Sequence, residues 1–240
     1  MKFRYLQFLI SNFKYYIFSY CNITIIIFKT NKIKALIPEN VELVAVSKFH
    51  PVEKIKEVYD CGQRVFGENK VQELLTKVDD LPKDIQWHLI GHLQTNKVKY
   101  IAPFIDTIQS VDSEKVLLEI NKEAEKNNRK IKVLLQVKIA EEDTKYGLEI
   151  LEAKEIFSNY LEQKYPNVEI IGLMGMATFT DNKTQVKSEF MVLKSLFDEL
   201  SRFKKLEKLS VVVSDDFPLV IECGANSVRI GSVIFGNRNY

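Results

Sequence analysis

From residue 41 onward, short apolar stretches rich in β-branched residues alternate with segments whose apolar residues recur at helical spacing. Sustained alternation of this kind favours parallel strands joined by right-handed helical crossovers. Eight such units predict an α/β fold with a single closed (β/α)8 barrel of the TIM type, and an open doubly wound sheet is the alternative. No predicted strand is followed by a glycine-rich dinucleotide-binding loop or a P-loop, which disfavours the open sheet. The predicted strands are 41–47, 64–66, 85–90, 105–109, 132–139, 168–173, 208–213 and 228–230, and the predicted helices are 51–59, 70–78, 94–99, 113–126, 150–163, 183–203, 217–222 and 233–235.

The composition is that of an ordinary globular protein. Of its 240 residues, 46% are apolar and 28% are charged, which argues against a disordered or fibrous chain. The 34 basic and 32 acidic residues give a net charge of only +2, so we expect no general attraction to nucleic acid or to an anionic membrane. Cys21, Cys61 and Cys223 are few and far apart, which argues against a disulfide framework or a thiolate zinc site. This cysteine usage fits a reducing, cytoplasmic compartment best.

Residues 1–32 are predicted to be an atypical apolar and basic N-terminal extension, and residues 33–240 are predicted to form the barrel domain. Residues 1–38 contain six basic side chains and no acidic one, and residues 15–28 carry no charge. This uncharged run is short for a bilayer span, which needs about 20 residues, and no small-residue cleavage site follows it. We therefore favour a surface helix, or a sequence translated from upstream of the true start, over a membrane-targeting segment.

Lys48 is the first candidate functional residue. In a barrel of this kind, chemistry belongs to the ends of the strands and to the loops that follow them. Lys48 directly follows the apolar strand predicted over 41–47, so its amine is expected at the barrel mouth. Partial loss of hydration lowers the pKa of a lysine, and the neutral amine is a nucleophile toward carbonyl carbons. The alternative, which position alone favours, is a lysine that extends from a strand end into solvent.

The segment 228–236 has the features of a phosphate site. Gly231 would let backbone N–H groups approach a ligand, and the helical turn after it offers its positive end to an anion. Ser214, at the end of the seventh strand, would add a hydroxyl to the same oxyanion. A simple turn that closes the barrel is the alternative. A nucleophilic amine opposite a phosphate site suits a phosphorylated aldehyde, for which pyridoxal 5′-phosphate (PLP) is the leading candidate.

Seven motifs follow one another along the chain: AVSKFHP, GQRVFGENKVQE, WHLIGHLQTNK, EEDTKYG, IGLMGMA, SDD and VRIGSVIFG. In this order they resemble the pyridoxal phosphate homeostasis (PLP-binding) protein family, similar in fold to the barrel domain of alanine racemases. The resemblance implies that Lys48 forms a Schiff base with PLP and that Arg229 faces the pyridine nitrogen. It also implies that Ser214 and the backbone of Gly231 and Ser232 hold the phosphate. The pocket walls that it implies are Asn69, His88 and Met174.

The chain departs from the pattern of this family in three places. Val212 stands in the seventh strand where the family usually has glycine, so a side chain is placed where backbone is expected to approach the cofactor. Lys138 stands where asparagine or histidine is usual, and the first 30 or so residues match nothing in the pattern. The first departure bears on how the phosphate is bound.

Arg229 and the length of the chain bear on catalysis. A permanently cationic guanidinium disfavours protonation of the pyridine nitrogen, so bound PLP is expected to stabilise substrate carbanions poorly. The resemblance also implies that racemases of this fold take a second acid/base residue from a C-terminal domain, for which this chain leaves no room before Tyr240. We therefore expect a protein that holds, buffers and delivers PLP without turnover and without a catalytic residue. A single-domain PLP-dependent amino-acid racemase or lyase is the alternative.

Other partners and ligands are expected to be few. Apo-forms of PLP-dependent enzymes are the expected protein partners, with no nucleic-acid or membrane partner, and the chain is expected to be a monomer. His88 and His92 are four residues apart, but they lie at the end of a predicted strand and no third ligand is evident. No metal site is therefore expected.

Overall fold

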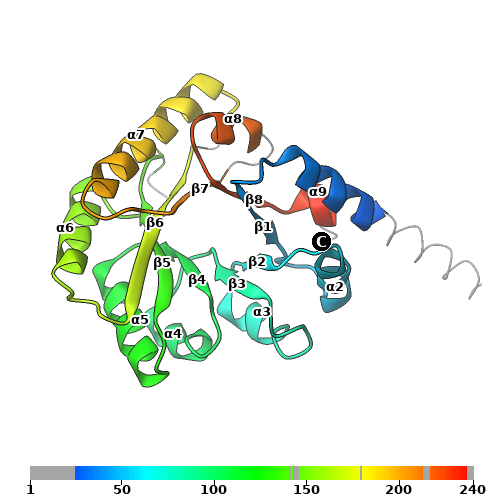
Figure 1. Ribbon diagram of the computed structural model, residues 1–240, viewed down its shortest axis with the longest axis horizontal. Helices are drawn as coiled ribbons and strands as arrows, with labels where there is room; N and C mark the ends of the chain where they lie inside the picture. Colours follow the sequence, from blue (N-terminus) through cyan, green and yellow to red (C-terminus); the bar gives the residue numbers. More distant parts are fainter. Residues whose placement is uncertain (1–24, 141, 143–145, 179, 213–216, 237–240) are drawn as a thin grey trace, which may run out of the picture.

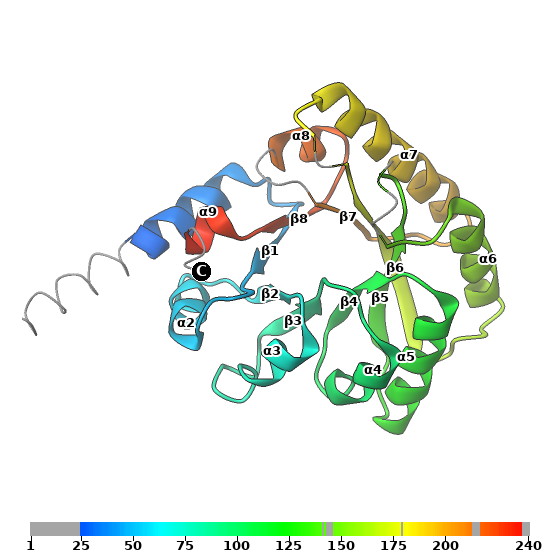
Figure 2. The same ribbon diagram turned by 180° about the vertical axis from the view of Figure 1, so that it is seen from behind.

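Eight parallel strands form a closed barrel in the order β1 to β8, with β8 paired to β1 (Figures 1 and 2). The computed structural model describes residues 25–140, 142, 146–178, 180–212 and 217–236. Helices α2 to α7 lie around the outside of the ring of strands. The predicted (β/α)8 barrel is confirmed, and the open doubly wound sheet is wrong.

The observed elements differ from the predicted ones mainly at their ends. β6 continues to Met176, and α3 already ends at Leu75. The strands are β1 (Glu42–Val46), β2 (Val65–Glu68), β3 (Gln86–Leu89), β4 (Thr107–Val111), β5 (Ile131–Val137), β6 (Val168–Met176), β7 (Lys208–Val212) and β8 (Ser227–Ile230). The helices are α2 (Val52–Asp60), α3 (Val71–Leu75), α4 (Thr95–Ile101), α5 (Glu114–Lys126), α6 (Ile150–Leu161), α7 (Lys183–Ser201), α8 (Phe217–Glu222) and α9 (Ser232–Phe235).

Side chains along each strand alternate between the helix layer and the barrel interior. The main apolar cluster combines strand residues such as Val228 and Ile230 with helix residues such as Ile55, so it lies between the barrel and the helices. Arg229, placed between Val228 and Ile230, therefore faces the interior. A separate small cluster belongs to that interior and consists of Leu134, Ile171 and Met174, with Met176 packed against it.

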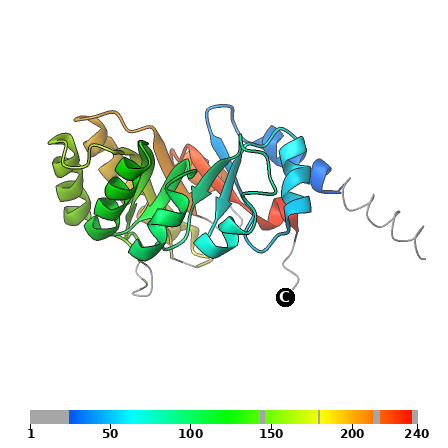
Figure 3. The same cartoon turned by 90° about the horizontal axis from the view of Figure 1, so that it is seen from below.

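Residues 25–36 form a helix that lies beside α9 and near the end of α2 (Figures 1 and 3). Ile26 and Ile33 are buried in the main core cluster. Lys34 Nζ donates to the carbonyl oxygen of Cys61 at 3.1 Å. The boundary predicted at residue 32 thus falls inside a helix that packs against the barrel. Within the described ranges, no helix is both long and apolar enough to cross a membrane.

Gly172 in β6 is required by the close approach of β7. A Cβ at this position would lie 1.8 Å from the carbonyl oxygen of Lys208. We expect Gly172→Ala to lower the free energy of unfolding by about 3 kcal/mol, because the added methyl meets backbone that the closed barrel holds in place. Urea denaturation measures the change. Gly231→Ala is the matched control, because its Cβ would lie 3.3 Å from Val46; equal losses in the two variants would contradict the explanation.

Candidate functional site

The carboxyl ends of β1 and β8 bring two of the predicted functional segments together. Ala45 of β1 pairs with Ile230 of β8. Lys48 follows the first of these strands and Gly231 follows the second. A Cβ on Gly231 would lie 3.3 Å from both the Cβ and the carbonyl oxygen of Val46. The loops that begin at these strand ends are therefore immediate neighbours.

Lys48 occupies the second position of a tight turn. The N–H of His50 donates to the carbonyl oxygen of Ser47 at 3.1 Å, which closes the turn. Phe49, at the third position, has a φ of 67°, whereas Lys48 has no positive φ. This combination is typical of a type II turn, whose third position favours glycine. Lys48 is partly exposed, so the turn leaves part of this residue accessible to solvent.

The turn is tied to α9 by a stacked pair of rings. The centroids of His50 and Phe235 are 4.8 Å apart and the planes differ by 18°. The first turn of a helix leaves amide N–H groups without intrahelical acceptors, and Ser232 begins α9. Backbone donors are thus placed next to the turn that contains Lys48. Ser214 lies outside the described residues.

Arg229 brings a buried cation into the barrel interior. The residue is 8% exposed, and its Nε and Nη2 have no hydrogen-bond partner among the described residues. Burial lowers the pKa of Arg229 to about 9, so the guanidinium is still cationic at neutral pH. A buried donor without an acceptor costs free energy until a partner satisfies it. The side chain therefore fits a ligand that offers a hydrogen-bond acceptor, such as a ring nitrogen.

Two of the predicted wall residues lie at different depths in the barrel. Asn69 directly follows β2, and a Cβ on Gly91 would lie 2.4 Å from the carbonyl oxygen of Asn69. The loops after β2 and β3 therefore pack closely at the mouth. Met174 is fully buried in the interior cluster. Their contact with a ligand stays a prediction.

His88 lies on the interior face of β3, and its ring contacts residues deeper in the barrel. The Nε2 of Gln109 donates to His88 Nδ1 at 2.8 Å, and His88 Nε2 lies 3.6 Å from Asp106 Oδ2. Burial alone would raise the pKa of Asp106, but His88, Thr107 and Lys132 together hold it well below its usual range. These residues line a cleft at the amino ends of the strands. The role of His88 as a wall of the ligand site stays a prediction.

The two histidines that are spaced four residues apart do not share a site. His92 Nδ1 lies 2.7 Å from Asp112 Oδ2, and the His92 ring stacks on Tyr146 with centroids 4.4 Å apart. His88 instead lies among the interior residues of the barrel. In the part of the chain that the structure describes, no three His, Cys, Asp or Glu side chains are grouped so as to hold a metal ion.

An ion cluster of Glu68, Glu73 and Lys77 packs against the turn that contains Lys48. The sequence patterns do not predict this cluster. Lys77 Nζ lies 2.8 Å from Glu68 Oε1 and 2.6 Å from Glu73 Oε1. The helix predicted over 70–78 ends at Leu75, and the Lys77 side chain is buried instead of lying on a solvated face. The available signal is the i,i+4 spacing of Glu73 and Lys77, which is common on exposed helices as well. Sequence spacing therefore could not separate this cluster from a surface pair.

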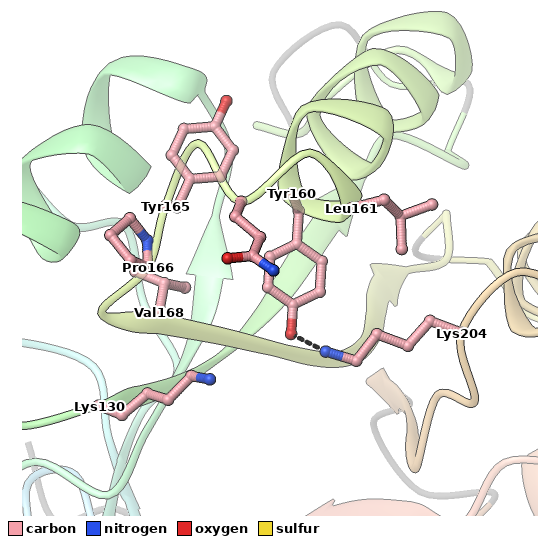
Figure 4. A pocket seen from close by; sticks show the side chains of 8 residues that line it. Lys130, Tyr160, Leu161, Tyr165, Pro166, Val168 and Lys204 are labelled. Carbon is pink, nitrogen blue, oxygen red and sulfur yellow. Dashed lines mark hydrogen bonds between the residues drawn. The ribbon is translucent and has the colours of Figure 1, made fainter.

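A cavity of about 290 Å³ lies away from these residues, where α6 ends near the start of β5 and β6 (Figure 4). Lys204 Nζ donates to the hydroxyl of Tyr160 at its rim. Lys130 and Val168, which also line it, mark the amino ends of two strands. Because Lys48 follows the carboxyl end of a strand, this cavity opens at the opposite end of the barrel. It is not part of the candidate site.

Comparison with known sequences assigns the chain to a family. The model of the family described as "Alanine racemase, N-terminal domain" matches residues 25–239. The pyridoxal phosphate homeostasis protein of Aquifex aeolicus is 44% identical over 202 residues, which are 83% of this chain and 88% of that protein. The protein of the same name from Schizosaccharomyces pombe is 39% identical over 203 residues, or 83% and 85% of the two chains. The resemblance predicted from the motifs is confirmed.

Comparison with solved structures gives the same grouping. PipY of Synechococcus elongatus, solved with PLP bound, has a TM-score of 0.78 and 32% identity, and the match covers 88% of this chain and all of PipY. An alanine racemase of Clostridium difficile has a TM-score of 0.73 at 17% identity, with 88% of this chain and 56% of the racemase covered. The second likeness shows the shared barrel fold alone.

Proposed function

This chain belongs to the alanine racemase N-terminal domain family and, within it, to the pyridoxal phosphate homeostasis proteins, and from that premise we propose that it is a PLP carrier. It holds PLP as a reversible Schiff base on Lys48, buffers the reactive aldehyde and delivers the cofactor. Two findings support the choice of ligand: the relatives bear this name, and PipY was solved with PLP bound.

The observation that carries the proposal is the buried guanidinium of Arg229, whose Nε and Nη2 have no partner among the described residues. Arg229 pairs in register with Val44 of β1, and Lys48 follows that same strand. The guanidinium and the amine thus come from neighbouring strands. A pyridine nitrogen is an uncharged acceptor that satisfies a donor of Arg229 and removes the cost of its burial.

Lys48 supplies the nucleophile. Its neutral amine adds to the aldehyde carbon of PLP, the C=N bond forms, and the aldehyde oxygen leaves as water. Addition of water reverses the step and releases PLP, as a carrier requires. PLP itself supplies the aldehyde and the electron-accepting ring.

The phosphate is held at the start of α9. Amide N–H groups at the beginning of a helix favour anions, and Gly231 and Ser232 place them beside the turn of Lys48. Ser214 adds its hydroxyl in this proposal. Val212, the last residue of β7, pairs with Met176 of β6. It thus lies near the proposed phosphate site.

Arg229 favours a carrier over an enzyme. Its positive charge disfavours a protonated pyridine nitrogen by like-charge repulsion, so the ring withdraws electrons weakly. The protein therefore binds PLP without turnover and without a catalytic residue. It works as a cytoplasmic monomer that passes PLP to apo-forms of PLP-dependent enzymes.

Purified protein incubated with PLP is expected to turn yellow, because a Schiff base absorbs visible light. Borohydride should bleach the colour and fix the reduced cofactor on the peptide that contains Lys48, as mass spectrometry would show. Incubation with an apo-enzyme should move the cofactor from unreduced protein and activate that enzyme. PLP fixed on other lysines, or PLP that never leaves, would contradict the proposal.

A further inference from the structure

We propose that the ion cluster of Glu68, Glu73 and Lys77 positions Lys48 by bracing its turn from both sides. Lys77 is therefore a positioning residue for PLP capture, and this inference rests on the proposed function. The cluster touches the backbone of the residues before and after Lys48. Nothing in the proposal requires Lys77 to contact PLP.

The first brace acts on Ser47, the residue before Lys48. Lys77 Nζ donates to the carbonyl oxygen of Ser47 at 3.1 Å. That oxygen is the one that accepts the N–H of His50 and closes the turn. The hydroxyl of Ser47 donates to Glu68 Oε1 at 2.7 Å, and the same carboxylate oxygen accepts from Lys77 at 2.8 Å. Three side chains thus fix the start of the turn.

The second brace acts on Phe49, the residue after Lys48. Its N–H donates to Glu73 Oε1 at 2.5 Å, and this oxygen also accepts from Lys77 Nζ at 2.6 Å. Hydrogen bonds that involve a charged group are stronger than neutral ones. The peptide between Lys48 and Phe49 is therefore anchored to a side chain that the Lys77 ammonium holds in place.

Phe49 shows why a brace is needed. Its φ of 67° is disfavoured for a bulky residue, and such backbone persists only where the surroundings determine it. The Phe49 side chain is 56% exposed, so its packing does not hold the conformation. Hydrogen bonds from the ion cluster to the Phe49 N–H and to the carbonyl oxygen of Ser47 stabilise it.

The burial of the ion cluster argues against a role in stability alone. Glu68 is fully buried and Lys77 is 5% exposed. Taking such charges out of water costs about as much as their attraction returns, and apolar replacements are often equally stable. Glu68 Oε2 has no partner among the described residues, and burial raises the pKa of Glu68 despite the opposing charge of Lys77. A set of charges that adds little stability fits a positioning role.

The first test uses the protein without PLP. Lys77→Met keeps an unbranched side chain as far as Cε but removes the ammonium, and hydrogen exchange at the amides of Phe49 and His50 is expected to become about tenfold faster or more. Lys208→Met is the matched control, since Lys208 pairs with Glu42 at 2.8 Å at the opposite end of the barrel. Should Lys77→Met fail to fold, Glu73→Ala removes the acceptor of the Phe49 amide and keeps the buried pair of Lys77 and Glu68. Folded variants with unchanged exchange at both amides would overturn the proposal.

The second test measures uptake of PLP by visible absorbance. Lys77→Met is expected to raise the Kd for PLP about tenfold or more, because the turn no longer holds Lys48 in one direction. Adding Phe49→Gly should restore affinity to within about threefold, since glycine adopts positive φ without strain. Thermal stability should not recover with it, because Glu68 and Glu73 still lack the ammonium.

The two tests separate this inference from the proposed function. If wild-type protein takes up no PLP, the carrier proposal fails, while amide exchange still shows whether the cluster braces the turn. If wild-type protein takes up PLP and Lys77→Met takes it up equally well, the positioning role fails and the carrier proposal stands. Equal losses of affinity in Lys77→Met and Lys208→Met would also overturn the positioning role.

Discussion

Lys48→Ala is expected to abolish the covalent attachment of PLP, so that borohydride fixes no cofactor on the protein and the visible band of the Schiff base is lost. Alanine has no amine, and backbone hydrogen bonds of Ser47 and Phe49 hold the turn that contains residue 48. The fold should persist, with the free energy of unfolding changed by less than about 1 kcal/mol, because Lys48 is only partly buried. Mass spectrometry after reduction and urea denaturation measure the two effects.

Lys138→Ala is the matched control for this substitution. Lys138 follows the carboxyl end of β5, as Lys48 follows that of β1, so both lysines belong to the same end of the barrel. The control should bind PLP on Lys48 with an unchanged visible band. Cofactor fixed at Lys138 or at another lysine in Lys48→Ala would show that the attachment site was misassigned. Residual noncovalent binding at the phosphate and at Arg229 is compatible with the proposal.

The barrel could be predicted from the sequence because its signals are local. β-branched apolar runs marked all eight strands, and helical spacing marked the segments between them, so most ends agree within a few residues. The exceptions depend on tertiary contacts. α3 ends three residues before the predicted end, and Lys77 beyond it is drawn into the ion cluster. β6 runs three residues further than predicted because β5 pairs with it as far as Gly175 and β7 as far as Met176.

The candidate site could be predicted only in part. Lys48 and Gly231 stand out because a charged residue or a glycine directly follows a strand, and barrel geometry places such residues at one end. The sequence does not show in the same way which side chains of neighbouring strands contact each other. His88 is also in a strand, but its partners are Gln109 and Asp106 from β4 and the loop before it. Contacts of this kind depend on register between strands, which no short pattern specifies.

The last prediction separates a carrier from an enzyme. With saturating PLP in deuterated water, we expect negligible exchange of the α-proton of alanine and of several other amino acids. The cation of Arg229 opposes protonation of the pyridine nitrogen, so the ring accepts the electrons of a carbanion poorly. Loss of one acid or base commonly lowers a rate by about 10²–10⁴. A trace of exchange therefore fits the proposal.

Proton NMR follows the exchange, and Lys48→Ala is the control that shows whether any exchange uses the proposed site. Exchange at ordinary enzyme rates that Lys48→Ala abolishes would overturn the carrier proposal in favour of a single-domain racemase or lyase. Exchange that is equal in wild-type protein and in Lys48→Ala would instead come from free PLP in solution. Failure to exchange, together with transfer of PLP to an apo-enzyme, is the outcome that a carrier requires, because reversible capture at Lys48 then serves delivery and not turnover.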